Sequence, residues 1–210
     1  MVTISKNTSI KMNKIKEILI GTNNTGNYKE ISALLPKEVK KYSLKEFKIV
    51  SPEETGKNFK ENSLIKASYF SRKTNLICLA DDSGLEIELL NGAPGIYSSR
   101  WSGKNKDFDI AIKKVFYEMS KIKKDWINNH NKANFVCCLT IFWPNGKNYT
   151  SKGIVEGKIS NKIKGNKGFG YDPIFIPNGY KKTFGEMEPN FKMSIDHRNK
   201  AFLKVKKFFD

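Results

Sequence analysis

Two adjacent carboxylates, Asp81 and Asp82, are the residues of this sequence that best fit chemistry on phosphates. They follow the apolar run 76–80, which is typical of a buried strand, and they precede Ser83 and Gly84. We expect a turn here, at the strand end where α/β sheets present catalytic groups. Neighbouring carboxylates repel unless a cation or a shared proton relieves them, and Mg²⁺ prefers such oxygen ligands. The pattern predicts a metal-phosphate site, although an Asp-Asp pair after a strand is also typical of a capped turn.

Two further segments could bind parts of a nucleotide. The polar turn 22–27 lies between an expected strand and an expected helix, where backbone N–H groups and the helix dipole favour anions. The segment 168–172 reads GFGYD, and its small residues would let a base lie flat against Phe169 or Tyr171. Taken alone, the first could be any polar turn, and the second is equally typical of a glycine-rich turn with core aromatics.

Five segments in a fixed order resemble the inosine triphosphate pyrophosphatase family: TGKNFKENSLIKA, ADDSGL, GAPGIYSSRWSG, GFGYDPIF and DHRNKA. The resemblance extends from about residue 18 to residue 209. It implies Mg²⁺-dependent hydrolysis of non-standard purine nucleoside triphosphates (ITP, dITP and XTP) to a monophosphate and pyrophosphate. It also implies a homodimer, and an elongated mixed sheet with a nucleotide-binding cleft between two lobes.

The resemblance also assigns roles to individual residues. Asp82 matches the general base and a metal ligand, Glu53 matches the second metal-binding carboxylate, and Asp81 is a possible third. The phosphate-binding residues would be Thr22, Asn23, Asn24, Thr25, Gly26, Asn27, Lys66, Ser83 and Gly84. The base-binding residues would be Phe169, Gly170, Tyr171, Asp172, Lys192, His197 and Arg198. Fixed hydrogen-bond donors would pair with the 6-oxo group of a purine. They would be left unpaired against the 6-amino group of adenine, so we expect strong selectivity.

Two positions depart from the family pattern. Asn27 stands where the family has a phosphate-contacting lysine, and Lys29, two residues further on, points in another direction on a helix. Asp196 stands where a serine usually precedes the His-Arg pair. The first departure concerns how tightly the triphosphate is held, and the second adds negative charge near the base site.

The hydrophobic pattern predicts an α/β fold with a mixed sheet flanked by helices. Strands are expected at 16–21, 39–44, 76–80, 133–143 and 147–159, with a hairpin at Pro144-Asn145-Gly146. Helices are expected after the turn 22–27 and at 58–73, 107–119 and 194–209, and segment 121–132 is expected to be a loop. We expect residues 1–14 to be a flexible extension and residues 15–210 to form a single domain.

The composition limits the partners and the compartment. Three cysteines form an odd set, which favours reduced thiols and a cytoplasmic protein, and no apolar run has the length of a signal peptide or membrane span. The net charge of +17 invites a nucleic-acid-binding protein as the alternative class. However, arginine occurs only at Arg72, Arg100 and Arg198, whereas base readers rely on arginine. The convergent carboxylates favour an enzyme over a nucleic-acid-binding protein. We expect no specific nucleic acid and no membrane as a partner. A positive field would steer triphosphates toward the cleft of such an enzyme.

Overall fold

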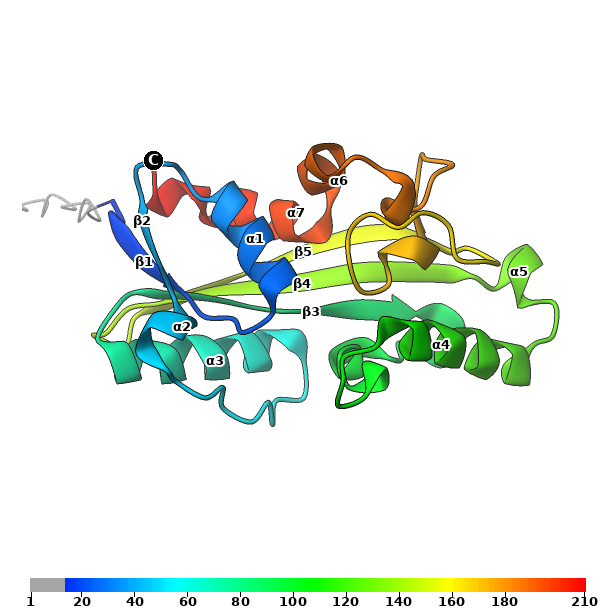
Figure 1. The fold of residues 1–210 in the computed structure, drawn as a ribbon, viewed down its shortest axis with the longest axis horizontal. Helices are drawn as coiled ribbons and strands as arrows, with labels where there is room; N and C mark the ends of the chain where they lie inside the picture. Colours follow the sequence, from blue (N-terminus) through cyan, green and yellow to red (C-terminus); the bar gives the residue numbers. More distant parts are fainter. Residues whose placement is uncertain (1–13) are drawn as a thin grey trace, which may run out of the picture.

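A six-stranded mixed sheet forms the centre of the computed structural model, which describes residues 14–210 (Figure 1). The strand order is β2-β1-β3-β4-β5-β6; β1 is parallel to both β2 and β3, and the other neighbours are antiparallel. The strands are β1 (Glu17–Ile20), β2 (Lys40–Ser43), β3 (Cys78–Ile87), β4 (Lys132–Phe142), β5 (Asn148–Ile159) and β6 (Phe175–Pro177). The predicted α/β class is confirmed, and the expected N-terminal extension lies, apart from residue 14, outside the described residues.

Helices cover both faces of this sheet. Helices α1, α6 and α7 lie above the strands in Figure 1, and α2 and α3 lie below them. The α-helices are α1 (Thr25–Leu34), α2 (Leu44–Phe47), α3 (Phe59–Thr74), α4 (Phe108–Ile122), α5 (Trp126–Asn129), α6 (Pro189–Ile195) and α7 (His197–Val205). Short 3₁₀ turns occupy Glu88–Leu90, Gly95–Tyr97, Arg100–Ser102, Asp172–Ile174, Phe184–Glu186 and Lys206–Phe208. Within residues 14–210, no helix combines the length and apolarity needed to cross a bilayer.

The first strand is much shorter than its neighbour β3. The two pair only at Leu19–Cys78 and Ile20–Leu79, after which the chain of β1 turns away. β3 continues to Ile87, because β4 pairs with it along its whole length. Residues 80–85 of β3 therefore have no strand on the β1 side, and we call this stretch of free edge the β3 notch. The expected turn at residues 81–84 is wrong, since this pairing keeps both carboxylates within a strand.

Buried apolar residues form separate clusters toward the two ends of the sheet. One cluster joins Ile18, Ile20 and Leu79 to the inner faces of α1 and α7, and a neighbouring cluster packs α3 against β1 and β3. A third cluster joins Leu85 and the start of β4 to α4 and β6. Strands β3, β4 and β5 run through both ends, so the notch lies between two packed lobes that share a sheet (Figure 1).

Two expected elements differ from the structure. The predicted helix 194–209 is interrupted, because the side chain of Asp196 accepts a hydrogen bond from the Asn199 backbone N–H at 2.8 Å and caps a new helix, α7. The predicted loop 121–132 contains α5, whose Trp126 is buried and stacks on Phe116. An isolated aromatic in a polar stretch gave no periodic signal for that short helix.

Candidate active site

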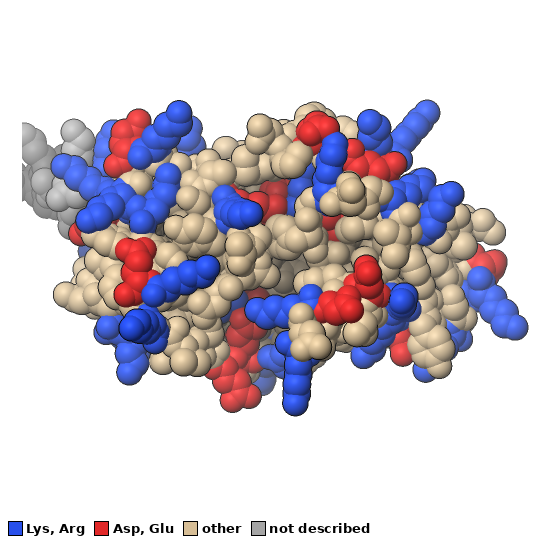
Figure 2. Space-filling view, in the orientation of Figure 1, with Lys and Arg blue, Asp and Glu red and all other residues tan. Residues whose placement is uncertain are grey.

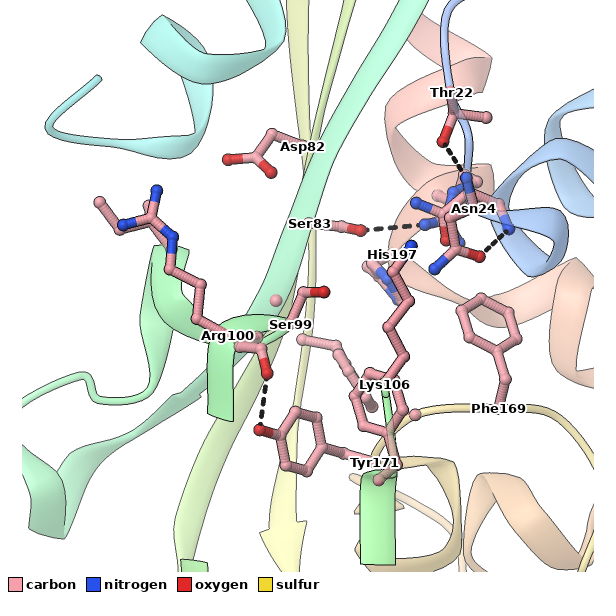
Figure 3. A pocket seen from close by; sticks show the side chains of 18 of the residues that line it. Thr22, Asn24, Asp82, Ser83, Ser99, Arg100, Lys106, Phe169, Tyr171 and His197 are labelled. Atoms are coloured by element: carbon pink, nitrogen blue, oxygen red, sulfur yellow. Dashed lines mark hydrogen bonds between the residues drawn. The ribbon is translucent and has the colours of Figure 1, made fainter. Parts of the chain in front are cut away.

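A cleft of about 210 Å³ opens at the β3 notch and gathers residues from all five sequence segments. Most of the predicted site residues line it: Thr22, Asn23, Asn24, Asn27, Lys66, Asp82, Ser83, Gly84, Phe169, Gly170, Tyr171, Asp172, Lys192, His197 and Arg198. Figure 3 shows Asp82 on one side of β3 and Ser83 on the other, because successive strand residues point to opposite faces. The cleft thus wraps around a bare strand edge and reaches both faces of the sheet.

On the α3 face, Asp82 lies beside the ammonium group of Lys66. The Lys66 Nζ is 3.5 Å from Asp82 Oδ1 and 2.6 Å from Glu54 Oε1. Burial raises the pKa of Asp82 to about 7, an effect that Lys66 opposes and Glu54 adds to. Burial also works against the charge of Lys66, but Asp82, Asp81 and Glu54 together raise its pKa. This pair therefore combines a fixed cation with a carboxylate that can take up a proton near neutral pH.

The second predicted metal ligand, Glu53, does not line the cleft. Its side chain is exposed, whereas the adjacent Glu54 reaches Lys66 and the cleft. Successive residues of an extended segment point in opposite directions, so only one of the two can face Asp82. The structure favours Glu54, a residue that the motif alone could not separate from its neighbour. A role of Glu53 in metal binding stays a prediction.

Asp81 points to the opposite face from Asp82, so the two carboxylates do not share one cation as the sequence suggested. Its Oδ2 accepts hydrogen bonds from Arg198 Nη2 at 3.0 Å, Asn27 Nδ2 at 2.9 Å and Ser83 Oγ at 3.2 Å. Burial raises the pKa of Asp81, but Arg198 and Lys66 outweigh this and lower it. Asp81 therefore ties α7 and the 22–27 turn to β3 as a buried anion, and it does not line the cleft.

Four charged residues beneath Phe169 form a buried ionic network. Lys192 Nζ lies 2.8 Å from both Glu30 Oε1 and Asp172 Oδ2, and its ammonium is 5.0 Å from the Phe169 ring centroid. Arg198 pairs with the other oxygen of Glu30. Burial works against the charge of Lys192, but Asp172 and Glu30 raise its pKa. Glu30, on α1, was not predicted from the sequence, because one glutamate on a polar helix face carries no signal.

The two aromatics of the GFGYD segment have different environments. Phe169 is partly exposed at the cleft, and its ring lies where a side chain on Gly26 would be, at 2.8 Å from the position of a Cβ. Tyr171 is buried, packs edge-on against Phe108, and donates its hydroxyl to the Ser98 carbonyl at 2.9 Å. Phe169 is therefore the ring available to a base, and Tyr171 fixes the loop that carries it.

His197 is a buried, neutral histidine. Its ring stacks on Phe135 at 4.7 Å, and burial lowers its pKa well below the usual range, with Arg198 and Lys192 adding to the effect. Within the described residues, three polar atoms around the cleft are buried without a hydrogen-bond partner: His197 Nδ1, Arg198 Nε and Asp82 Oδ2. Such groups are rare in native proteins and mark places where a ligand, ion or water completes the bonding.

The turn that follows β1 is built as a helix N-terminus. The Asn24 side chain accepts from the Asn27 backbone N–H at 3.1 Å and begins α1. Thr22, Asn23, Asn24 and Asn27 line the cleft, whereas Thr25 and Gly26 do not. Asn27 has its amide committed to Asp81, so it brings no positive charge to the cleft.

Sequence reasoning missed several residues that line the cleft: Ser51, Glu54, Ile96, Ser98, Ser99, Arg100, Lys106, Phe108 and Phe135. Four of them, Ile96, Ser98, Ser99 and Arg100, belong to the GAPGIYSSRWSG segment, which marked the family but was given no role, and Lys106 lies three residues beyond it. Arg100 donates to the Glu54 carbonyl at 2.8 Å and holds that loop against the cleft. Lys106 has a left-handed backbone, with φ 54°.

The chain matches the model of the Ham1 family over residues 18–208 and belongs to that family. Among curated relatives, the dITP/XTP pyrophosphatase of Caulobacter vibrioides is 40% identical over 190 residues, covering 90% of this chain and 96% of the relative. That of Bacillus cereus is 40% identical over 200 residues, covering 92% and 95%.

Solved structures agree with this assignment. A HAM1 protein from Coxiella burnetii superposes with a TM-score of 0.82 at 36% identity, covering 91% of this chain and 96% of that chain. A nucleoside-triphosphatase, also called a dITP/XTP pyrophosphatase, from Mycobacterium abscessus gives 0.73 at 34% identity, covering 90% and 98%.

Proposed function

We propose that this protein hydrolyses non-standard purine nucleoside triphosphates (ITP, dITP and XTP) to the nucleoside monophosphate and pyrophosphate, and so clears them from the nucleotide pool. The relatives called dITP/XTP pyrophosphatases support the substrate class. The observation that carries the proposal is the placement of a raised-pKa carboxylate, Asp82, in the same cleft as the cationic and aromatic groups around Phe169.

In this proposal, Asp82 accepts a proton from the water that attacks between the α and β phosphates. A general base works best when its pKa lies near the working pH, and burial provides this for Asp82. Lys66 holds the carboxylate oxygen and faces the phosphates with its positive charge. Removal of the proton and orientation of the water are thus both assigned to one face of β3.

The residues present fit a magnesium ion. Mg²⁺ is commonly held by one or two carboxylates plus substrate phosphates, and Asp82 with its unpartnered Oδ2 and the nearby Glu54 match that donor set. Within residues 14–210, no set of three or more acidic, histidine or cysteine side chains is arranged for a metal, which leaves the remaining ligands to water and phosphate. When bound, the ion would neutralise charge on the phosphates.

The base end supports selection of a 6-oxo purine. Phe169 offers one face for stacking, and Lys192, His197 and Arg198 bring donor groups that are fixed by burial and by the network through Glu30. A donor fixed in this way finds an acceptor in a 6-oxo group and another donor in a 6-amino group. ATP would then be rejected because its 6-amino group leaves these fixed donors without an acceptor.

The remaining parts of the proposal concern setting and assembly. Cys78, Cys137 and Cys138 are buried free thiols, which suits a reducing compartment, and we propose a cytoplasmic protein. We propose a homodimer on the strength of the family resemblance. Light scattering on a size-exclusion column would test it, with elution at the monomer mass as the contradicting result.

The direct test is release of pyrophosphate from ITP, dITP, XTP, GTP and ATP with and without Mg²⁺. We expect turnover of the first three, weak turnover of ATP, and loss of activity with a chelator. Equal kcat/KM for ITP and ATP would contradict the proposed substrate class. Release of inorganic phosphate alone, without pyrophosphate, would contradict the proposed bond.

A further inference from the structure

Lys106 is a cleft-lining cation without an anionic partner in the described chain. Four other basic residues line the same cleft, and each is engaged: Lys66 by Glu54 and Asp82, Lys192 by Glu30 and Asp172, Arg198 by Glu30 and Asp81, and Arg100 by the Glu54 carbonyl. Between residues 14 and 210, neither a salt bridge nor a side-chain hydrogen bond involves Lys106. Its charge is therefore available to a ligand.

The backbone holds Lys106 in place. Its φ of 54° is in the left-handed region, which a lysine rarely adopts. The turn is fixed on both sides, because the Lys106 N–H donates to the Gly103 carbonyl at 3.2 Å and the Asp107 N–H donates to the Ser102 carbonyl at 3.0 Å. Asp107 then caps α4 through the Asp109 N–H at 2.9 Å. Backbone strain of this kind persists where the surrounding structure imposes it, and it often occurs at ligand sites.

The side chain extends from this turn into the middle of the cleft. Figure 3 shows Lys106 reaching from the lobe that carries α4 toward His197 and Asn24 on the other lobe. Asp82 and Phe169 lie on opposite sides of this path. A nucleotide with its base on Phe169 and its scissile bond near Asp82 must place the phosphate between them, the α-phosphate, close to the Lys106 ammonium.

We propose that Lys106 binds the α-phosphate of the substrate and is a substrate-binding cation of this site. The inference rests on the proposed function and adds one contact to it. Asn27 lines the same cleft but is neutral and bonded to Asp81, so it cannot supply this charge. Lys106 supplies it from the opposite lobe.

The test compares Lys106→Gln with Lys104→Gln, a matched control on the same exposed loop that does not line the cleft. We expect Lys106→Gln to lower kcat/KM for ITP about tenfold at low salt, and Lys106→Arg to retain most of it. Lys106→Gly removes the charge and also relieves the left-handed backbone, and it should lose as much as Lys106→Gln, because the lost charge and not the backbone conformation causes the defect. Wild-type-like kcat/KM in Lys106→Gln would overturn the proposal.

Product inhibition identifies the phosphate. Inosine monophosphate keeps the α-phosphate and pyrophosphate does not, so Lys106→Gln should weaken inhibition by the first and leave the second unchanged. Equal weakening of both would overturn the assignment to the α-phosphate. Calorimetric binding of inosine monophosphate gives the same comparison without turnover. If the wild type hydrolysed none of the triphosphates, the proposed function would fail, whereas equal monophosphate affinity of wild type and variant would still decide against Lys106.

Discussion

Alternation along a single strand gives neighbouring carboxylates different roles. Asp82 faces Lys66 and has a raised pKa, whereas Asp81 faces Arg198 and has a lowered one. A difference of this kind between two carboxylates commonly separates the proton acceptor from the permanently charged partner. The chemistry of the motif thus depends on its being in a strand.

Asp82→Asn is expected to reduce turnover of ITP by roughly 10²- to 10⁴-fold, because the amide keeps the shape of the side chain but cannot accept the proton. Pyrophosphate release at saturating substrate measures the effect, and thermal unfolding checks that the variant is folded. Asp81→Asn is the comparison that separates base loss from disturbance of the strand. More than about a tenth of wild-type turnover in Asp82→Asn would remove it from the chemical step.

Glu54→Gln and Glu53→Gln form a matched pair at adjacent positions. Because Glu54 reaches Lys66 and lines the cleft while Glu53 is exposed, we expect Glu54→Gln to raise the Mg²⁺ concentration for half-maximal activity several-fold, as losing a metal-site carboxylate does. Glu53→Gln should leave it close to wild type. A magnesium titration of each variant decides between them, and the reverse order would restore Glu53 as the ligand.

At the scale of elements, β5 and α7 approach each other closely. A Cβ on Gly153 would lie 2.1 Å from the His197 carbonyl oxygen and 2.4 Å from the Ala201 nitrogen, both backbone atoms. Gly153→Ala must therefore displace α7, and we expect about 1–3 kcal/mol lower stability together with a higher KM for ITP. Chemical denaturation and steady-state kinetics measure both. Lys152→Ala, at the adjacent exposed position, is the control, and an unperturbed Gly153→Ala would mean that α7 is free to move.

Asp196 caps the start of α7, and its ionisation makes the stability of the folded protein depend on pH. Burial, with the charge of Glu30, raises its pKa to about 6, well above the ordinary value of an aspartate. A carboxyl whose pKa is raised on folding contributes stability that is full below its unfolded pKa and is lost as pH rises through about 6.

Asp196→Ser keeps a capping oxygen and removes this charge. We therefore expect the Tm difference, variant minus wild type, to be larger at pH 8 than at pH 4.5, by roughly 2–4 °C for each kcal/mol recovered. Asp196→Ala, which also loses the cap, should lie about 1 kcal/mol below Asp196→Ser at both pH values. A Tm difference that does not change with pH would mean that Asp196 is not the titrating group.

The longer strands and helices could be predicted from the sequence because their apolar patterns are local, whereas the short elements α2, α5, α6 and β6 were not predicted. The length of β3 could not, since pairing with β4 and not local propensity carries it through polar residues 81–83. The residues of the cleft were found where a motif marked them. Glu30, Glu54 and Lys106 were missed, because their roles depend on which direction a side chain takes, and that is set by tertiary structure.

At the scale of the whole molecule, the positive charge is dispersed. Lys and Arg side chains are scattered over the face in Figure 2 and form no continuous stripe. We expect kcat/KM for ITP to fall as salt rises from about 20 mM to 500 mM, because long-range attraction of the triphosphate is screened. The kcat at saturation should change much less. A salt-independent kcat/KM would show that the charge of +17 plays no part in capture.

The same positive charge allows a test of the alternative hypothesis, that this is a nucleic-acid-binding protein. Binding of duplex DNA, followed by fluorescence anisotropy, should be weak and without sequence preference, and it should disappear near physiological salt. Tight binding of one particular DNA sequence at physiological salt would favour the hypothesis of a nucleic-acid-binding protein.

Strands β3, β4 and β5 keep an unbroken register from one lobe to the other. Two lobes joined by flexible loops can swing as rigid bodies, whereas lobes that share a hydrogen-bonded ladder cannot shear without breaking it. A change in sheet twist would keep these hydrogen bonds, so we expect it to be the main relative motion of the two lobes. We therefore expect substrate choice to depend on fit to a cleft that is largely formed before binding. A different substrate preference would then require different residues on the loops around β3, while the shared sheet of β3, β4 and β5 stays the same.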